Sequence, residues 1–239
     1  MPASTTTPLV LINGSGDSHI CWMRQIAALP AGTAIAADLP GHGDRIDDPA
    51  APTTVAAYAA DMWTYLESQG ITNVGVAGHS LGGAIALQMA LDRPDSVVAL
   101  GLIGTGARLR VLPDLLATSQ TDPQAALRQL LMLGYGDHLS PEALRVAIAS
   151  FLPIAPGAIS RDLCACDRFD VMPELGRVRC PTLVVVGEHD QLTPVKYARY
   201  LADHIPHARL LIIAGAGHYV MHEQPEQLTA AFRELQQAS

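Results

Sequence analysis

The chain has 239 residues, of which 49% are hydrophobic and 16% are charged. This composition is too apolar for a disordered protein and supplies a large core, so we expect one domain, with or without an inserted subdomain. Lys and Arg total 15 against 23 Asp and Glu, and the resulting net charge of -8 would repel a phosphate backbone, which argues against nucleic-acid binding.

The apolar stretches along the chain are short. Runs such as Leu9–Ile12 have the length of a strand and fall far short of the roughly 20 residues that cross a membrane as a helix, so we expect no membrane partner. Residues 1–8 are rich in Thr and lack the basic and apolar regions of a secretory signal, which favours the cytoplasm. The four cysteines lack the spacing of a disulfide framework or a zinc site, so reduced thiols are expected.

Six apolar runs recur along the chain without alternating polar residues, which is typical of strands buried on both faces of a parallel sheet. They are Leu9–Ile12, Thr33–Ala37, Val74–Ala77, Val97–Ile103, Leu183–Val186 and Leu210–Ile213. Helical stretches lie between them, namely Ile20–Leu29, Thr53–Gln69, Leu81–Asp92, Pro194–Ile205 and Pro225–Gln237. This alternation predicts an α/β fold with a mostly parallel sheet of about six strands and helices on both faces.

The loop after the first strand, Asn13-Gly14-Ser15-Gly16, contains two glycines that let the backbone turn its N–H groups toward a ligand. In enzymes with a serine nucleophile, such a loop supplies one donor to the oxyanion and the residue after the serine supplies the other. We expect the amides of Ser15 and Leu81 to form this oxyanion hole, each worth roughly 3 kcal/mol of transition-state stabilisation. The alternative, a phosphate-binding loop, lacks the spacing that it requires.

The stretch Gly78-His79-Ser80-Leu81-Gly82 lies between a predicted strand and a predicted helix. G-x-S-x-G in this context is typical of a nucleophile elbow, a tight turn that exposes a serine hydroxyl at the start of a helix. Gly78 and Gly82 fit because a Cβ would clash in so tight a turn. Ser80 is therefore the predicted nucleophile. A chance pentapeptide in a chain rich in small residues is the alternative, and the flanking strand and helix argue against it.

Residues 104–179 interrupt the alternation of strands and helices. No convincing buried strand occurs there, whereas Asp122–Leu133 and Pro141–Phe151 have a helical pattern. We therefore expect a core formed by residues 1–103 and 180–239 and a helical insertion over one edge of the sheet, together one structural unit.

A serine hydroxyl is a weak nucleophile and needs a histidine base that a carboxylate orients. In this type of fold the acid and then the histidine follow the serine, each just after a strand. Asp190 follows the strand Leu183–Val186, and His218 follows the strand Leu210–Ile213 on a glycine-rich loop. Both lie where an open α/β sheet places its ligand crevice. Asp190 is the predicted acid and His218 the predicted base.

Other residues compete for both roles. Glu188 is the rival acid, since either type of carboxylate can orient a histidine. His222 follows His218 closely and would share its direction, whereas His189 adjoins the predicted acid and would point elsewhere. The joint order of serine, acid and histidine would arise by accident far more rarely than any one of the three elements.

Together these motifs resemble the α/β-hydrolase fold superfamily, in its group of small bacterial esterase-like serine hydrolases. The resemblance rests on Asn13–Gly16, Asp38–Asp44, Gly78–Gly82, Pro181–Asp190 and Gly215–Pro225. The resemblance covers the predicted sheet and its helices, and only the inserted residues 104–179 have no motif that matches the family. It is specific for the fold and says little about the substrate.

The resemblance implies that residues 104–179 are a helical cap over an acyl pocket. Candidate substrate-binding residues of that pocket are Gly14, Trp22, Met132 and Phe151, although an apolar side chain of this kind is more often part of the core.

Two features depart from the family. Asn13 stands where the family usually has His, so the hydrogen bonding of the oxyanion loop is expected to differ. Few residues precede Leu9, so the antiparallel hairpin with which the family usually begins is expected to be absent or reduced.

The favoured function is cleavage of an ester-type bond in a small or medium substrate through an acyl-enzyme, as in a carboxylesterase. No metal or organic cofactor is implied, because the sequence has no HExxH motif and no cysteine–histidine cluster. A lactonase, a thioesterase, a carbon–carbon bond hydrolase and a perhydrolase are alternatives, because the same three residues serve them all. A ligand-binding protein on a hydrolase scaffold is less favoured, because binding alone does not need these groups. Both a monomer and a homodimer are compatible with the sequence.

Overall fold

The computed structural model describes residues 7–135, 142, 151 and 154–238. Its six described strands form one sheet in the order β2-β1-β3-β4-β5-β6, and every pairing between them is parallel. The strands are β1 (Leu9–Ile12), β2 (Ala34–Ala37), β3 (Val74–His79), β4 (Val97–Ile103), β5 (Thr182–Gly187) and β6 (Ala208–Ile213). The prediction of an α/β fold with a six-stranded parallel sheet is confirmed.

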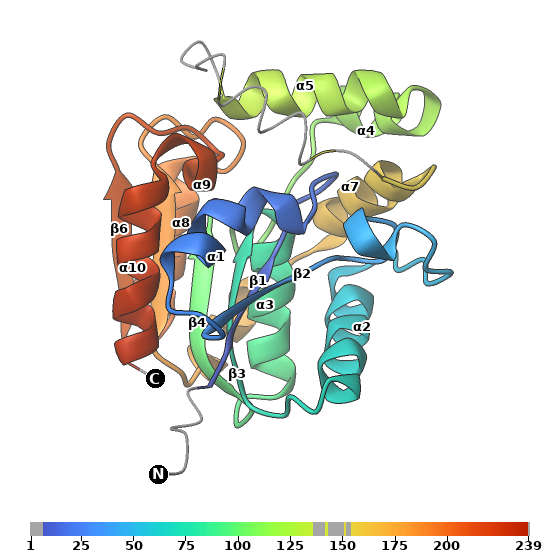
Figure 1. Cartoon of the computed structure of the whole chain (residues 1–239). Coiled ribbons are helices and arrows are strands. Elements are labelled where there is room, and N and C mark those ends of the chain that lie inside the picture. Colours follow the sequence, from blue (N-terminus) through green and yellow to red (C-terminus); the bar gives the residue numbers. More distant parts are fainter. Residues whose placement is uncertain (1–6, 136–141, 143–150, 152–153, 239) are drawn as a thin grey trace.

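Helices cover both faces of the sheet (Figure 1). The core divides accordingly into two apolar clusters, with Val10 of β1 in one cluster and its neighbours Leu9 and Leu11 in the other, because successive side chains of a strand point to opposite faces. One face carries α2 (Val55–Ser68), α3 (Leu81–Asp92) and α8 (Val195–His204); the other carries η1 (His19–Trp22), α1 (Met23–Ala28), α9 (Val220–Glu223) and α10 (Pro225–Gln237). The central strands β1, β3 and β5 are therefore buried along their whole length.

The elements described between β4 and β5 are helices, joined by loops. They are α4 (Pro113–Thr121), α5 (Pro123–Tyr135), α7 (Ala158–Arg168) and η4 (Met172–Arg177). Helices α4 and α5 lie beyond the carboxyl ends of the strands (Figure 1). The predicted helix Asp122–Leu133 corresponds to α5, whereas Pro141–Phe151 falls outside the described residues except for Glu142 and Phe151.

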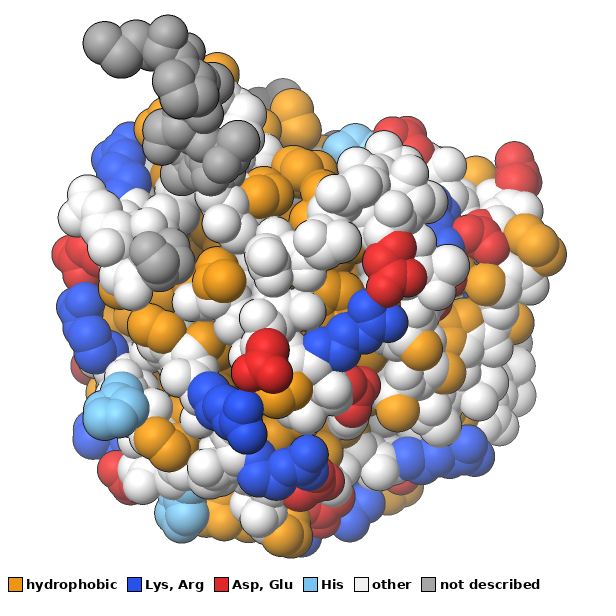
Figure 2. Space-filling model, turned by 90° about the horizontal axis from the view of Figure 1, so that it is seen from below, with side chains coloured by type: hydrophobic (Ala, Val, Ile, Leu, Met, Phe, Trp, Pro, Cys, Tyr) orange, Lys and Arg blue, Asp and Glu red, His pale blue; other side chains and the backbone are white. Residues whose placement is uncertain are grey.

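Charges of both signs are mixed on the face of the molecule turned away from α4 and α5, where basic side chains lie beside acidic ones (Figure 2). In the part of the chain that the structure describes, no helix is both long enough and apolar enough to cross a membrane. All four cysteines are free thiols.

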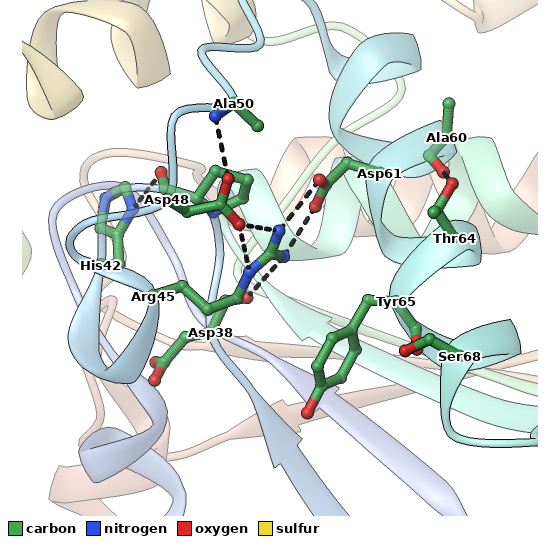
Figure 3. A network of polar contacts seen from close by, with 11 residues as sticks. Asp38, His42, Arg45, Asp48, Ala50, Ala60, Asp61, Thr64, Tyr65 and Ser68 are labelled. Carbon is green, nitrogen blue, oxygen red and sulfur yellow. Dashed lines mark hydrogen bonds and ion pairs between the residues drawn. The ribbon is translucent and has the colours of Figure 1, made fainter.

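The loop after β2 is fastened to α2 by one arginine. The guanidinium of Arg45 lies between the carboxylates of Asp48 and Asp61, with distances of 3.0 Å from Nε to Asp48 Oδ2 and 2.7 Å from Nη1 to Asp61 Oδ2 (Figure 3). The Ala50 amide and then the Arg45 guanidinium hold the pKa of Asp48 below its ordinary value. These contacts fix the loop that places His42 against the site described next.

Candidate active site

Ser80 occupies a strained turn between β3 and α3, with a backbone φ of 52°. A residue with a side chain rarely adopts this conformation, which costs on the order of 1–3 kcal/mol and persists only where the surroundings enforce it. The surroundings are close here, since a Cβ on Gly78 would lie 2.1 Å from the carbonyl oxygen of Gly82, and one on Gly82 would lie 2.3 Å from that of Ile12. The two glycines thus let the turn form against β1.

Asp190 and His218 form a buried pair at the carboxyl ends of β5 and β6. His218 Nδ1 lies 2.8 Å from Asp190 Oδ2, and their side chains are 3% and 0% exposed. The other oxygen of Asp190 accepts hydrogen bonds from the amides of Leu192 and Thr193, at 2.9 and 2.8 Å. Burial opposes the charge, but the attraction of His218 and these hydrogen bonds outweigh it, so the pKa of Asp190 lies below its ordinary value.

An ionised Asp190 can only accept a hydrogen bond, so it selects the tautomer of His218 that carries its proton on Nδ1. Nε2 of His218 is then left with a lone pair, which is what a general base requires.

A second acid holds the loop that carries His218. The carboxylate of Glu223, in α9, accepts the amide of Gly217 at 2.8 Å and the amide of Tyr219 at 3.0 Å, so it grips the backbone on both sides of the histidine. Glu223 is not among the site residues predicted from the sequence. The sequence feature that could have indicated it is an acidic residue in the first turn of a short helix soon after His218.

Two further contacts hold the backbone of His218 itself. Its amide donates to the carbonyl of Gly134, at the end of α5, at 2.8 Å, and its carbonyl accepts Nε2–H of His79 at 3.0 Å. Burial, together with the neighbouring His218, lowers the pKa of His79 well below its ordinary value, so His79 acts as a neutral donor. Helix α5 is packed so closely here that a Cβ on Gly134 would lie 2.3 Å from the ring of Tyr219.

Asn13 braces the loop after β1. Its buried side chain donates from Nδ2 to the carbonyl of Asp17 at 2.7 Å and to that of Gly14 at 3.1 Å. Asn13, which stands where the family usually has His, therefore stabilises the loop through hydrogen bonds to its own backbone.

The two amides predicted to form the oxyanion hole belong to Ser15, which lines the cavity described below, and to Leu81. Leu81 is the first residue of α3, so its N–H has no partner within the helix. Among the described residues, neither of these two amides has an acceptor, whereas the amide of Ser80 already donates to the carbonyl of Ile103 at 2.9 Å.

A buried aspartate on α7 joins the loop after β1 to the rest of the fold. Asp162 Oδ2 accepts the amide of Gly16 and Nε2–H of His42, both at 3.0 Å, and its Oδ1 accepts the hydroxyl of Tyr58 at 2.6 Å. Asp162 and His42 are 0% exposed. Burial lowers the pKa of His42, but the charge and hydrogen bond of Asp162 outweigh it, so this pKa lies above its ordinary value.

We expect Asp162→Ala to lower the free energy of unfolding by about 3–4 kcal/mol, because it leaves three buried donors without an acceptor. Urea unfolding followed by circular dichroism measures this loss. Asp203→Ala, on the exposed surface of α8, is the matched control and should change stability by less than about 0.5 kcal/mol. A loss of less than about 1 kcal/mol in Asp162→Ala would contradict the assignment.

A cavity of about 510 Å³ brings the site together, a volume within the range of small-molecule sites. Its polar lining includes Gly14, Ser15, His79, Ser80 and His218. Its apolar lining includes Leu109, Leu115, Leu130, Leu163 and Leu192. The predicted nucleophile and the predicted base therefore line the same cavity.

Residues 9–232 match the alpha/beta hydrolase family. The chain belongs to this family. A curated relative named for carbamate hydrolysis, RutD of Pseudomonas savastanoi pv. phaseolicola (strain 1448A / Race 6), is 32% identical over 223 residues, which cover 88% of this chain and 86% of the relative.

Solved structures of other alpha/beta hydrolases superpose closely. A thermophilic esterase is 35% identical with a TM-score of 0.82, and the match covers 95% of this chain and 88% of the esterase. The enol-lactonase from Burkholderia xenovorans LB400 is 23% identical with a TM-score of 0.87, and the match covers 98% of this chain and 92% of the lactonase. At that lower identity the likeness shows the fold alone.

The structure places the four residues predicted to bind substrate in different surroundings. Gly14 lines the cavity, but Trp22, Met132 and Phe151 are not among its described lining residues. Trp22 is fully buried and packs against Phe232 of α10, with ring centroids 6.0 Å apart, and Phe151 is also buried. Met132 is 76% exposed, because it lies on the outward side of α5. An apolar residue type does not reveal which side of a helix faces the cavity.

The rival acid lies away from the base. The Glu188 side chain is 52% exposed, and its Oε2 accepts the amide of Gly215 at 3.2 Å and lies 3.8 Å from Nε2 of His189. The geometry therefore brings Asp190 to His218.

The rival base is engaged by a tyrosine. His222 is buried, and its Nδ1 forms a hydrogen bond with the hydroxyl of Tyr135. His222 is not among the described residues that line the cavity.

Burial, and then the nearby Arg24, lower the pKa of His222 from an ordinary value of 6.5 to about 4. Between these values the unfolded chain binds a proton that the folded chain does not, so stability is complete above the unfolded pKa and falls as the pH drops toward 4. We expect His222→Gln to abolish about 2–3 kcal/mol of this pH dependence, measured by urea unfolding at pH 7 and about pH 4.5. His204→Gln, at an exposed site, should retain it, and equal pH dependence in wild type and His222→Gln would refute the assignment.

One group of potential metal ligands occurs among the described residues. Ligand atoms of His19, Asp38 and Asp44 lie within 4.8 Å of one another. The oxygens of Asp38 already accept Nδ1–H of His19 at 2.7 Å, the amide of His19 at 2.6 Å and the amide of Asp44 at 2.8 Å. These hydrogen bonds explain why the three residues lie together, because they link η1 to the loop after β2.

Proposed function

We propose that this alpha/beta hydrolase cleaves an ester-type bond of a small or medium substrate through an acyl-enzyme. The observation that carries the proposal is a single cavity lined by Ser80, at its strained turn, and by His218, whose Nδ1 is bonded to the buried Asp190. The thermophilic esterase that is 35% identical supports the same chemistry.

In the first half of the reaction, Ser80 Oγ attacks the carbonyl carbon while His218 Nε2 takes the hydroxyl proton. Asp190 stabilises the resulting imidazolium, and the amides of Ser15 and Leu81 bind the oxyanion of the tetrahedral intermediate. The intermediate collapses as His218 returns the proton to the leaving alcohol.

In the second half, water attacks the acyl-enzyme, and His218 takes its proton and passes it to Ser80 as the carboxylic acid departs. Every step is an acyl or proton transfer that these groups supply, so the mechanism requires neither a metal nor an organic cofactor.

Carbamate hydrolysis is the second candidate, because a relative named for that activity is 32% identical along most of both chains. The same attack on a carbamate would give a carbamoyl-enzyme, which water would release more slowly because nitrogen donates electrons to the carbonyl.

A fluorophosphonate probe tests the serine chemistry, because it phosphonylates only an activated serine that it can reach. We expect wild type to be labelled and Ser80→Ala not to be. Release of 4-nitrophenol from 4-nitrophenyl esters of rising acyl length, compared with a 4-nitrophenyl carbamate, then separates the two candidates. Folded wild type that resists labelling would instead favour a ligand-binding protein on a hydrolase scaffold.

A further inference from the structure

Two basic side chains belong to the lining of the cavity. Arg110 lies in the segment Leu109–Pro113, just before α4, and Lys196 lies in the segment Gln191–Tyr197, at the start of α8. Both are exposed to solvent. Much of the remaining lining is apolar.

Neither charge is paired with a carboxylate in the part of the chain that the structure describes. Among the described residues, Arg110 and Lys196 form no ion pair; Arg110 Nη1 donates to the backbone carbonyl of Asp167 at 2.8 Å, and Lys196 Nζ lies 5.7 Å from the ring centroid of Tyr197. Several other arginines are paired with carboxylates, as Arg45 is in Figure 3.

Acidic residues of the described cavity lining do not offset the positive charges of Arg110 and Lys196. Among the described lining residues the acidic one is Asp17, which is 1% exposed and accepts the amide of Ser18 at 2.8 Å. The chain as a whole carries a net charge of -8, so its general field repels anions. Arg110 and Lys196, which form no ion pair among the described residues, place two positive charges on the cavity lining against this general field.

We propose that the cavity selects substrates that carry a carboxylate, separated from the scissile carbonyl by an apolar chain. The inference rests on the proposed acyl-transfer function and names its substrate class. The leucine-lined wall receives the apolar chain, Arg110 offers a planar fork that matches a carboxylate, and Lys196 offers a compact charge. Because both cations are exposed, the preference is moderate and is weakened by salt.

The test compares mono-4-nitrophenyl esters of adipic, suberic and sebacic acid with their ω-carboxamide analogues, which have the same shape without the charge. At low salt we expect kcat/KM to favour at least one acid about tenfold, mainly through KM, and the preference to shrink toward about one at roughly 1 M salt. The double variant Arg110→Gln, Lys196→Gln should lose the preference. Arg199→Gln removes the same charge from α8 outside the cavity and should keep both the preference and the activity.

An acid-to-amide ratio near one in wild type, or a ratio that survives in the double variant, would overturn the proposal while leaving the esterase function intact. If no ester is hydrolysed in a Ser80-dependent way, the proposed function itself fails. Titration calorimetry of adipate, suberate and sebacate with Ser80→Ala at low salt is independent of turnover. Binding that is weakened when Arg110→Gln and Lys196→Gln are added to Ser80→Ala supports the cation site, and no binding of any of the three diacids overturns it.

Discussion

Ser80→Ala should lower kcat for a 4-nitrophenyl ester by at least about 10⁴-fold while the protein stays folded. The large loss is expected because the covalent step loses its predicted nucleophile. The fold should survive because the backbone amide of Ser80 still donates to Ile103, and the turn depends on Gly78 and Gly82 rather than on the hydroxyl. Steady-state kinetics and thermal unfolding measure the two effects.

The matched control is Ser68→Ala, at an exposed position at the end of α2, which should keep wild-type activity. Residual activity of Ser80→Ala above about 1% of wild type, in protein free of contaminating esterase, would show that Ser80 is not the nucleophile.

The second large effect is expected for Asp190→Asn, which should lower kcat by roughly 10³-fold, less than the loss of the nucleophile. A neutral asparagine neither stabilises the imidazolium nor enforces a proton on Nδ1 of His218. The amides of Leu192 and Thr193 retain an oxygen acceptor, so the loop should keep its shape. The rate at saturating ester, with circular dichroism as a check of folding, measures the change.

Glu188→Gln provides the matched control, because the rival acid is half exposed and bonds to the amide of Gly215 instead of His218. Its kcat should stay within about twofold of wild type. A greater loss in Glu188→Gln than in Asp190→Asn would transfer the role of acid to Glu188.

The helical segment between β4 and β5 takes part in holding the site together. Its α5 supplies the Gly134 carbonyl that accepts the amide of His218, and its α7 supplies the Asp162 carboxylate that accepts the amide of Gly16. The loops that carry the predicted base and the predicted oxyanion donor are therefore both anchored to residues outside the sheet.

The sequence by itself determined the sheet, the turn at Ser80 and the order of Ser80, Asp190 and His218. These features are local, because a buried parallel strand is a continuous apolar run, a tight turn needs glycine, and loops after parallel strands meet at one edge of the sheet. The pairing of His218 with Asp190 at 2.8 Å follows the same rule.

Only the tertiary structure decided which side chains line the cavity and which long-range contacts stabilise the loops around it. Met132 is apolar yet exposed, whereas the charged Arg110 and Lys196 line the cavity, because the direction of a side chain depends on how its segment packs against others. The bond from the Gly16 amide to Asp162 joins residues that are far apart in the sequence. No local pattern encodes such a contact, since it exists only once the chain has folded.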